Sequence, residues 1–163
     1  MFSNLKISEF KKFAESQFGL EIRSTPLETC AGHRTQPHEL RGMFLTGSKN
    51  KVIFRSKKEN IFGLLEFIKK YGRRCQNLIV FDKKIGNAIA LLCAYLKVKE
   101  VYGFIGSKPA KKTLKKFKIK FYFSKTIPYI LNQKGTDICP MEKLSFSKTP
   151  EMFLAALRTN NFC

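Results

Sequence analysis

Apolar and polar residues alternate along the chain in patterns that predict a sheet with interleaved helices. Two apolar runs at residues 42–47 and 52–57 flank a polar link at 48–50, which predicts a β-hairpin. Residues 61–72 then place apolar side chains at helical spacing, and Gly72 is a suitable C-terminal residue for that helix. The chain from residue 41 therefore begins as a hairpin followed by a helix.

The same kind of alternation continues to residue 123. Residues 78–81 read LIVF, a continuous apolar run typical of a strand that is covered on both faces. A helical stripe, a strand, a helix and a strand are then predicted at 85–96, 101–105, 109–117 and 119–123. Units of this length pack as helices on both faces of a sheet. The predicted fold class is α/β, a three-layer α/β/α sandwich with a five-stranded mixed sheet that opens with the hairpin.

Both ends of the chain differ from this central pattern. Residues 5–18 have the spacing of a short helix with Ser8 as its N-cap, and residues 19–40 carry Gly and Pro with little periodicity. We therefore divide the chain into an N-terminal helix and linker (1–40) and an α/β domain (41–163). A final helix is expected after Thr149, with Pro150 at its first position.

Composition indicates a globular protein in a reducing compartment. The 163 residues are 44% hydrophobic, enough for an ordinary core. The five cysteines are odd in number and widely spaced, so no disulfide framework is expected. No apolar stretch is long enough to span a bilayer, and we expect a cytoplasmic protein without membrane contact. The cysteines are Cys30, Cys75, Cys93, Cys139 and Cys163.

The strong positive charge of the chain makes polyanions its first candidate partners. Lys and Arg total 31 against 12 Asp and Glu, a net charge of +19. No acidic residue occurs from Val101 to Thr136, and aromatic residues follow the basic run at 121–123, a combination that can hold single-stranded nucleic acid. The alternative is a solvated helix face, with a lysine excess that reflects codon usage. The candidate nucleic-acid contacts are Lys108, Lys111, Lys112, Lys115 and Lys116.

A candidate ligand site follows the strand at 78–81. Asp82 and Lys83 stand where that strand is expected to meet the start of a helix, where backbone N–H groups favour anions. Gly86 would allow a ligand to approach the backbone closely. The alternative is that Asp82 only caps the helix and that Gly86 serves close packing.

A second polar cluster lies in the loop that Gly135 and Pro140 shape. Cys139 would act as a nucleophile if Lys143 or Lys83 lowered the pKa of its thiol. In the alternative, Cys139 fills the edge of the core and the acidic residues cap the backbone around it. The candidate ligand-binding residues of this loop are Thr136, Asp137, Cys139, Glu142 and Lys143.

The only histidines of the chain suggest half of a zinc site. Cys30 and His33 are spaced as metal ligands, and His38 follows. A structural zinc site takes four ligands, and no fourth one is near in sequence. We therefore expect no metal and no cofactor.

Two stretches resemble a known family. VFDKKIGNAIALLCAY (80–95) and TIPYILNQKGTDICPMEKL (126–144) are similar to a family of uncharacterised proteins, a domain of unknown function that is placed in the cytidine deaminase-like superfamily, over residues 41–158. The resemblance implies a five-stranded sheet that opens with a hairpin. Zinc deaminases carry His-x-Glu and Pro-Cys-x-x-Cys at two helix starts. Here those positions read KKEN (57–60) and DKKIG (82–86), so zinc-dependent deamination is not expected.

Three functions remain open at this point. The first is binding of a nucleotide or RNA in a pocket between Asp82-Lys83 and the loop at 136–143. The second is a metal-independent transferase or hydrolase that uses Cys139 or Lys83, with Asp82 or Glu142 for proton transfer. The third is a module that docks on other proteins or the ribosome.

Overall fold

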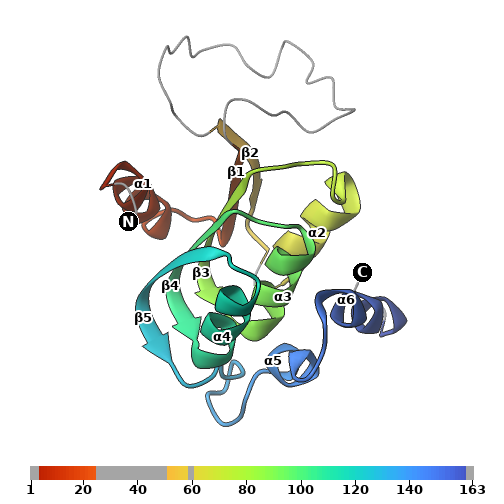
Figure 1. The fold of residues 1–163 in the computed structure, drawn as a ribbon. Coiled ribbons are helices and arrows are strands. Elements are labelled where there is room, and N and C mark those ends of the chain that lie inside the picture. The colour runs from red at the N-terminus through yellow and green to blue at the C-terminus, as the bar shows by residue number, and fades with distance from the viewer. Residues whose placement is uncertain (1–3, 25–50, 59–60, 161–163) are drawn as a thin grey trace.

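A five-stranded mixed sheet forms the centre of the molecule (Figure 1). The computed structural model describes residues 4–24, 51–58 and 61–160. The strand order is β2-β1-β3-β4-β5, with β1 antiparallel to both neighbours and β3, β4 and β5 mutually parallel. The strands are β1 (Leu20–Ser24), β2 (Lys51–Ser56), β3 (Leu78–Ile85), β4 (Glu100–Ser107) and β5 (Lys120–Ile127).

The predicted α/β class and mixed sheet are confirmed, but the opening of the sheet differs from the prediction. The partner of β2 is β1, with Leu20 opposite Ser56, and β1 falls in the stretch 19–40 that we predicted to be a loop or linker. The prediction failed because the five residues of β1 are too few to show a clear strand alternation, and Gly19 and Pro26 flank them. Strand 42–47 and the metal motif at 30–38 lie outside the described residues.

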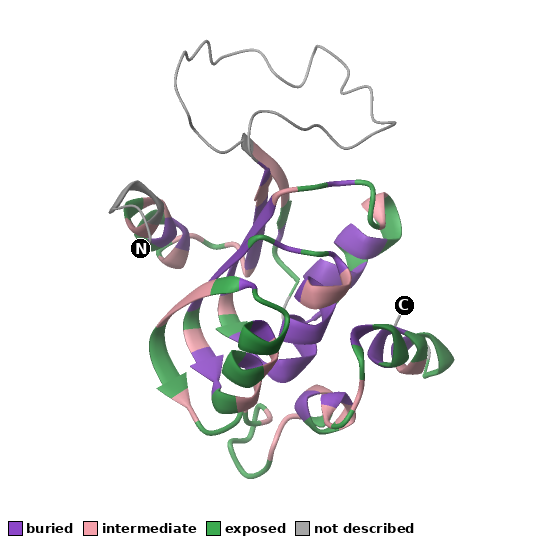
Figure 2. Cartoon of the chain, in the orientation of Figure 1, coloured by how far each residue is buried: buried purple, intermediate pink, exposed green. Residues whose placement is uncertain are grey.

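Six helices are described, and they lie on both sides of the sheet (Figure 1). The larger core packs β1, β3 and β4 against α2, α3 and α4, and α6 adds its apolar face (Figure 2). On the other face α1 alone, among the described helices, covers the sheet. The helices are α1 (Asn4–Ala14), α2 (Phe62–Tyr71), α3 (Asn87–Tyr95), α4 (Lys108–Lys116), α5 (Pro140–Ser145) and α6 (Pro150–Thr159).

Aromatic rings attach α1 to the sheet. Phe10 and Phe13 of α1 are buried against Ile79, Phe81 and Tyr102. The Phe10 ring lies 6.1 Å from the Phe81 ring and 6.0 Å from the Tyr102 ring, which are ordinary aromatic packing distances. The N-terminal helix is therefore an integral layer of the fold.

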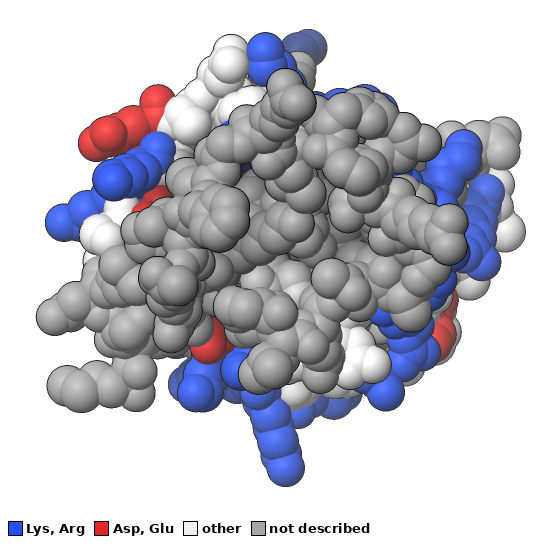
Figure 3. Space-filling model, turned by 90° about the horizontal axis from the view of Figure 1, so that it is seen from above, with Lys and Arg blue, Asp and Glu red and all other residues white. Residues whose placement is uncertain are grey.

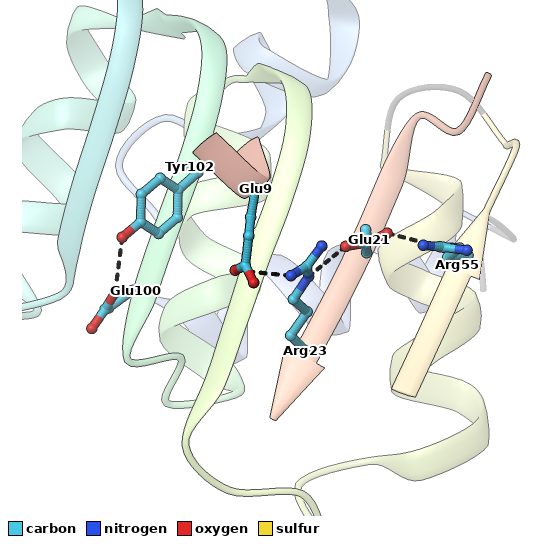
Figure 4. Close-up of polar contacts among 6 residues, drawn as sticks. All are labelled: Glu9, Glu21, Arg23, Arg55, Glu100 and Tyr102. Carbon is cyan, nitrogen blue, oxygen red and sulfur yellow. Dashed lines mark hydrogen bonds and ion pairs between the residues drawn. The ribbon is translucent and has the colours of Figure 1, made fainter. Parts of the chain in front are cut away.

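An ion-pair chain adds a second attachment between α1 and the sheet (Figure 4). The guanidinium of Arg23 pairs with Glu9 of α1 at 2.9 Å and with Glu21 at 2.5 Å. Glu21 also pairs with Arg55 of β2 at 2.7 Å. The Glu21 carboxylate is buried, and its two arginine partners offset the cost of removing that charge from water.

Helix ends follow the predicted chemistry in two of three places. Gly72 ends α2 with a φ of 58°, and the Thr149 hydroxyl accepts a hydrogen bond from the Met152 N–H at the start of α6. Ser8, the predicted N-cap of the first helix, instead lies inside α1, which begins at Asn4.

The state of the cysteines differs from the prediction that the chain has no disulfide. Cys75 is disulfide-bonded, whereas Cys93 and Cys139 are free thiols. The expectation of a reducing compartment therefore loses its basis in cysteine usage. Among the helices described, none combines the length and apolar character that crossing a bilayer requires.

Candidate functional site

The pair Asp82-Lys83 does not stand at a helix start. β3 continues to Ile85, so both residues lie within the strand and neighbouring side chains point to opposite faces. The Asp82 carboxylate is buried on the larger-core side and accepts the Lys84 N–H at 2.9 Å. The Lys83 ammonium donates to the Ser16 carbonyl at 2.6 Å, beyond the end of α1. The predicted placement of these two residues at a helix start is wrong, and Gly86, not Asp82, stands at the N-cap of α3.

Burial governs the ionisation of Asp82. It raises the pKa of this carboxyl to about 8, although the N–H groups of Lys84 and Lys83 and the charge of Lys84 act in the opposite direction. Burial also raises the pKa of the Cys93 thiol, and the nearby Asp82 adds to that increase. Asp82 and Cys93 are thus neutral neighbours in the core at neutral pH.

The N-terminus of α3 is occupied by a carboxylate of the protein itself. The Glu142 side chain comes from α5, is 1% exposed, and accepts the Asn87 N–H at 2.5 Å. Burial raises the pKa of Glu142, while the Ser107 hydroxyl and the N–H groups of Asn87, Ile130 and Ala88 oppose that increase. The anion position that we predicted for a ligand is therefore filled from within.

The Glu142 carboxylate lies so close to the backbone of residue 86 that only glycine fits there without a shift. A Cβ atom at residue 86 would lie 2.4 Å from Oε2 of Glu142 and 3.1 Å from a side-chain carbon of Ile130. No larger residue fits without displacing Glu142. The close backbone approach predicted for Gly86 is present, but the approaching group is Glu142.

A small cavity adjoins Glu142. Gly86, Cys139 and Glu142 line it together with Lys84, which was not among the predicted site residues. Its volume of about 30 Å³ is that of one water molecule. The structure thus brings three predicted site residues together, around a space too small for an organic substrate.

The remaining predicted residues lie in the exposed turn before α5 and on α5 itself, where they bond to nearby polar groups. Lys143 pairs with Asp137 at 2.6 Å, and this hydrogen bond lowers the pKa of Asp137. The Thr136 N–H donates to the Asn132 side chain at 3.1 Å. Lys143 of α5 therefore pairs with Asp137, and among the described residues no direct contact supports the expected activation of Cys139 by Lys143.

A buried polar network, missed in the sequence, joins three helices. The Thr113 hydroxyl of α4 donates to Asn87 Oδ1 at 2.5 Å, and Asn87 Nδ2 donates to the Ser145 hydroxyl at 2.9 Å. The one available signal was a polar residue directly after Gly86 at the start of an otherwise apolar helix. This network fixes α4 relative to α3 and α5.

The lysines of α4 form the strongest charge feature, which we call the lysine face. All five are exposed, and none has an acidic partner within residues 4–24, 51–58 and 61–160. The helix buries Ala110 and Leu114 on its opposite side, and the Ser107 hydroxyl caps it by accepting the Ala110 N–H. The face comprises Lys108, Lys111, Lys112, Lys115 and Lys116.

The aromatic residues predicted beside this face pack inward instead. Phe121 and Phe123 contact the larger core, and Tyr122 contacts the core under α1. The Phe123 ring lies over Gly106, where a Cβ atom would come within 2.0 Å of it. All three rings are therefore partly buried by contacts within the protein.

An open groove adjoins the lysine face at its N-terminal end. It has a volume of about 470 Å³. The Tyr129 ring is 42% exposed and meets the Phe146 ring edge-on at 6.0 Å. Neither ring was predicted as a site residue, because isolated aromatic residues in a loop carry no periodic signal. The groove is lined by Lys108, Pro109, Lys112, Pro128, Tyr129 and Phe146.

A metal centre finds no support in the described part of the chain. No three His, Cys, Asp or Glu side chains there lie close enough together to hold an ion. The residues at the starts of α2 and α3 do not supply the donors that a zinc deaminase needs.

Comparisons with known proteins place the chain in a family. A search of curated proteins gives no significant match. The crystal structure of a DUF1893 family protein (TM1506) from Thermotoga maritima is 22% identical, with a TM-score of 0.71 over 98% of this chain and 92% of that one. This likeness confirms the fold. The family model described as "Domain of unknown function (DUF1893)" matches residues 39–158. Because that match covers most of the sequence, the chain belongs to the DUF1893 family.

Proposed function

We propose that this protein is a non-catalytic RNA-binding protein that holds the phosphate backbone on the lysine face of α4. The observation that carries the proposal is five exposed ammonium groups on one nine-residue helix without acidic partners among the described residues. Lysines four residues apart repel each other and destabilise a helix. Phosphates would relieve that repulsion and release their counterions on binding.

The charge of the whole molecule supports the same partner. The net charge is +19, and Figure 3 shows Lys and Arg around much of the visible rim with few acidic side chains between them. Such a field attracts polyanions from a distance and speeds their association. The lysine face would then provide the localised contact that the general field lacks.

The arrangement of the other candidate residues favours binding over catalysis. Lys83 is engaged by Ser16 on one side of the sheet, whereas Asp82 is buried on the other side. Cys139 adjoins a cavity the size of one water molecule. A deaminase-type scaffold without zinc ligands, as the sequence resemblance implies, is consistent with a binding role and would not support hydrolytic deamination.

The test compares two double variants with the same change in net charge. Lys111→Gln/Lys115→Gln removes two charges from the lysine face, and Lys12→Gln/Lys69→Gln removes two exposed charges from α1 and α2. Binding of a fluorescent 12-nucleotide oligouridylate is measured by anisotropy from 50 to 300 mM salt. Circular dichroism checks that both variants remain folded.

We expect the first variant to bind about tenfold more weakly near 100 mM salt. Its plot of log K against log salt should be shallower by about 1.4, because each single-strand phosphate contact contributes about 0.7 to that slope. The α1/α2 variant should retain a nearly unchanged slope. Equal losses in both variants would show that binding follows only the net charge, and this result would overturn the lysine face as the binding site.

A further inference from the structure

The groove beside the lysine face combines exposed positive charge with exposed aromatic surface. Two exposed lysines of α4 border it, and it also contains the half-exposed Tyr129 ring with Phe146 against its edge. Its volume of about 470 Å³ falls in the range of small-molecule sites, about 300 to 1,000 Å³. No acidic side chain lines it. The groove is therefore suited to a flat, partly apolar group that carries negative charge.

We infer that the groove takes one unpaired base of an RNA strand, with the base on the Tyr129 ring and its flanking phosphates on Lys108 and Lys112. This inference rests on the proposed function and specifies the form of RNA that is bound. A base in a duplex is stacked and paired, so it cannot enter the groove. Protein recognition of RNA is directed mostly to unpaired bases, which stack on aromatic side chains.

The start of α4 explains why lysines, and not backbone groups, would hold the phosphates. The Ala110 N–H is already bonded to the Ser107 hydroxyl at 3.2 Å, and Pro109 has no N–H. The positive end of the helix dipole still favours an anion there. Lys108 and Lys112 are one helical turn apart on the same side, so both ammonium groups can reach the groove.

Phe146 gives the stacking position its stability. Its ring is inclined by 68° to the Tyr129 ring, which is an edge-to-face contact. Phe146 directly follows α5, whose Glu142 and Ser145 are buried against α3. The buried network thus supports one wall of the groove, and α4 supplies the other wall.

The test uses the full chain, the 12-nucleotide oligouridylate and an RNA duplex of the same length. Tyr129→Ala removes the ring, Tyr129→Phe retains it, and Phe62→Ala removes a ring of equal exposure, 42%, on α2. Anisotropy gives the affinity of each protein for both RNAs at several salt concentrations. Thermal unfolding by circular dichroism verifies the fold of each variant.

We expect Tyr129→Ala to weaken single-strand binding by about 5- to 150-fold with an unchanged salt slope, because stacking on one aromatic ring contributes that much. Duplex binding should be unaffected by the change, because a paired base does not enter the groove. Tyr129→Phe and Phe62→Ala should bind as the unaltered protein does.

The outcomes separate this inference from the proposed function. If Tyr129→Ala binds the single strand normally while Lys111→Gln/Lys115→Gln loses affinity, the groove is overturned and the lysine face stands. An equal loss of duplex and single-strand binding in Tyr129→Ala would also overturn the groove. If the unaltered protein binds neither RNA, both proposals fail.

Discussion

The buried carboxyl of Asp82 makes the stability of the protein depend on pH in an unusual direction. Its pKa is about 8 in the folded protein and near the ordinary value of 3.8 in the unfolded chain. Between these values the unfolded chain is ionised and the folded protein keeps its proton. Stability from this group is therefore fully present below pH 3.8 and is lost as the pH rises towards 8.

The size of the effect follows from the same two values. Each pH unit in this interval corresponds to about 1.4 kcal/mol, so the folded state loses roughly 4 kcal/mol between pH 3.8 and pH 7. Asp82→Asn removes the ionisation and retains an oxygen that can accept the Lys84 N–H. We expect the variant to be more stable than the unaltered protein at pH 7 by a few kcal/mol.

The informative quantity is the change of this difference with pH. Burying the extra amide N–H groups of Asn adds a cost that is independent of pH, so the absolute difference is less telling than its slope. Urea unfolding followed by circular dichroism from pH 4 to pH 8 gives the free energy of unfolding for both proteins. The advantage of Asp82→Asn should shrink steadily as the pH falls.

Asp137→Asn is the matched control for the same chemical change. The pKa of Asp137 is lowered by Lys143, so this exposed carboxylate contributes stability above its unfolded pKa, and that contribution is lost on acidification. Above the ordinary pKa of 3.8 this carboxyl is ionised in both the folded and the unfolded chain, so the stability difference for Asp137→Asn should stay nearly constant from pH 5 to pH 8, in contrast to that for Asp82→Asn. A stability difference for Asp82→Asn that stays constant from pH 4 to pH 8 would refute a protonated, buried Asp82.

Three further predictions test the packing around α3 and α6. Gly86→Ala should lower the free energy of unfolding by about 1 to 3 kcal/mol, because its Cβ would overlap the Glu142 carboxylate; urea unfolding measures this, and an unchanged midpoint would contradict the contact. Thr149→Ala should cost about 1 kcal/mol by removing the N-cap of α6, whereas Thr149→Ser should cost little. In the native protein a thiol reagent should modify the half-exposed Cys139 and reach the buried Cys93 only after denaturation; mass mapping of the labelled peptides distinguishes them.

The predictions from sequence held where an element has a long, regular apolar pattern. They failed where contacts with distant residues define the element. The helix of α2 and its end at Gly72 follow from a regular apolar stripe. β1 and the extension of β3 through Lys83 have no such pattern, because tertiary pairing with neighbouring strands defines them. Local sequence cannot show which partner a strand will find.

The candidate site shows the same limit. The sequence marked Gly86 and Glu142 as unusual, but only the fold shows that they touch each other. The lysine face could be predicted, because it is a property of one helix. The groove could not, since Tyr129 follows β5 and Phe146 follows α5, and only the fold brings both rings beside α4.

The position of β1 has a consequence for how the chain folds during synthesis. β1 leaves the ribosome before β3, yet it must pair with β3 residue by residue, with Leu20 opposite Asp82 and Ser24 opposite Leu78. The sheet therefore cannot close until more than fifty further residues have been made, and folding depends on this long-range contact. Truncation at residue 39, where the family match begins, would leave β2 and β3 without the strand between them.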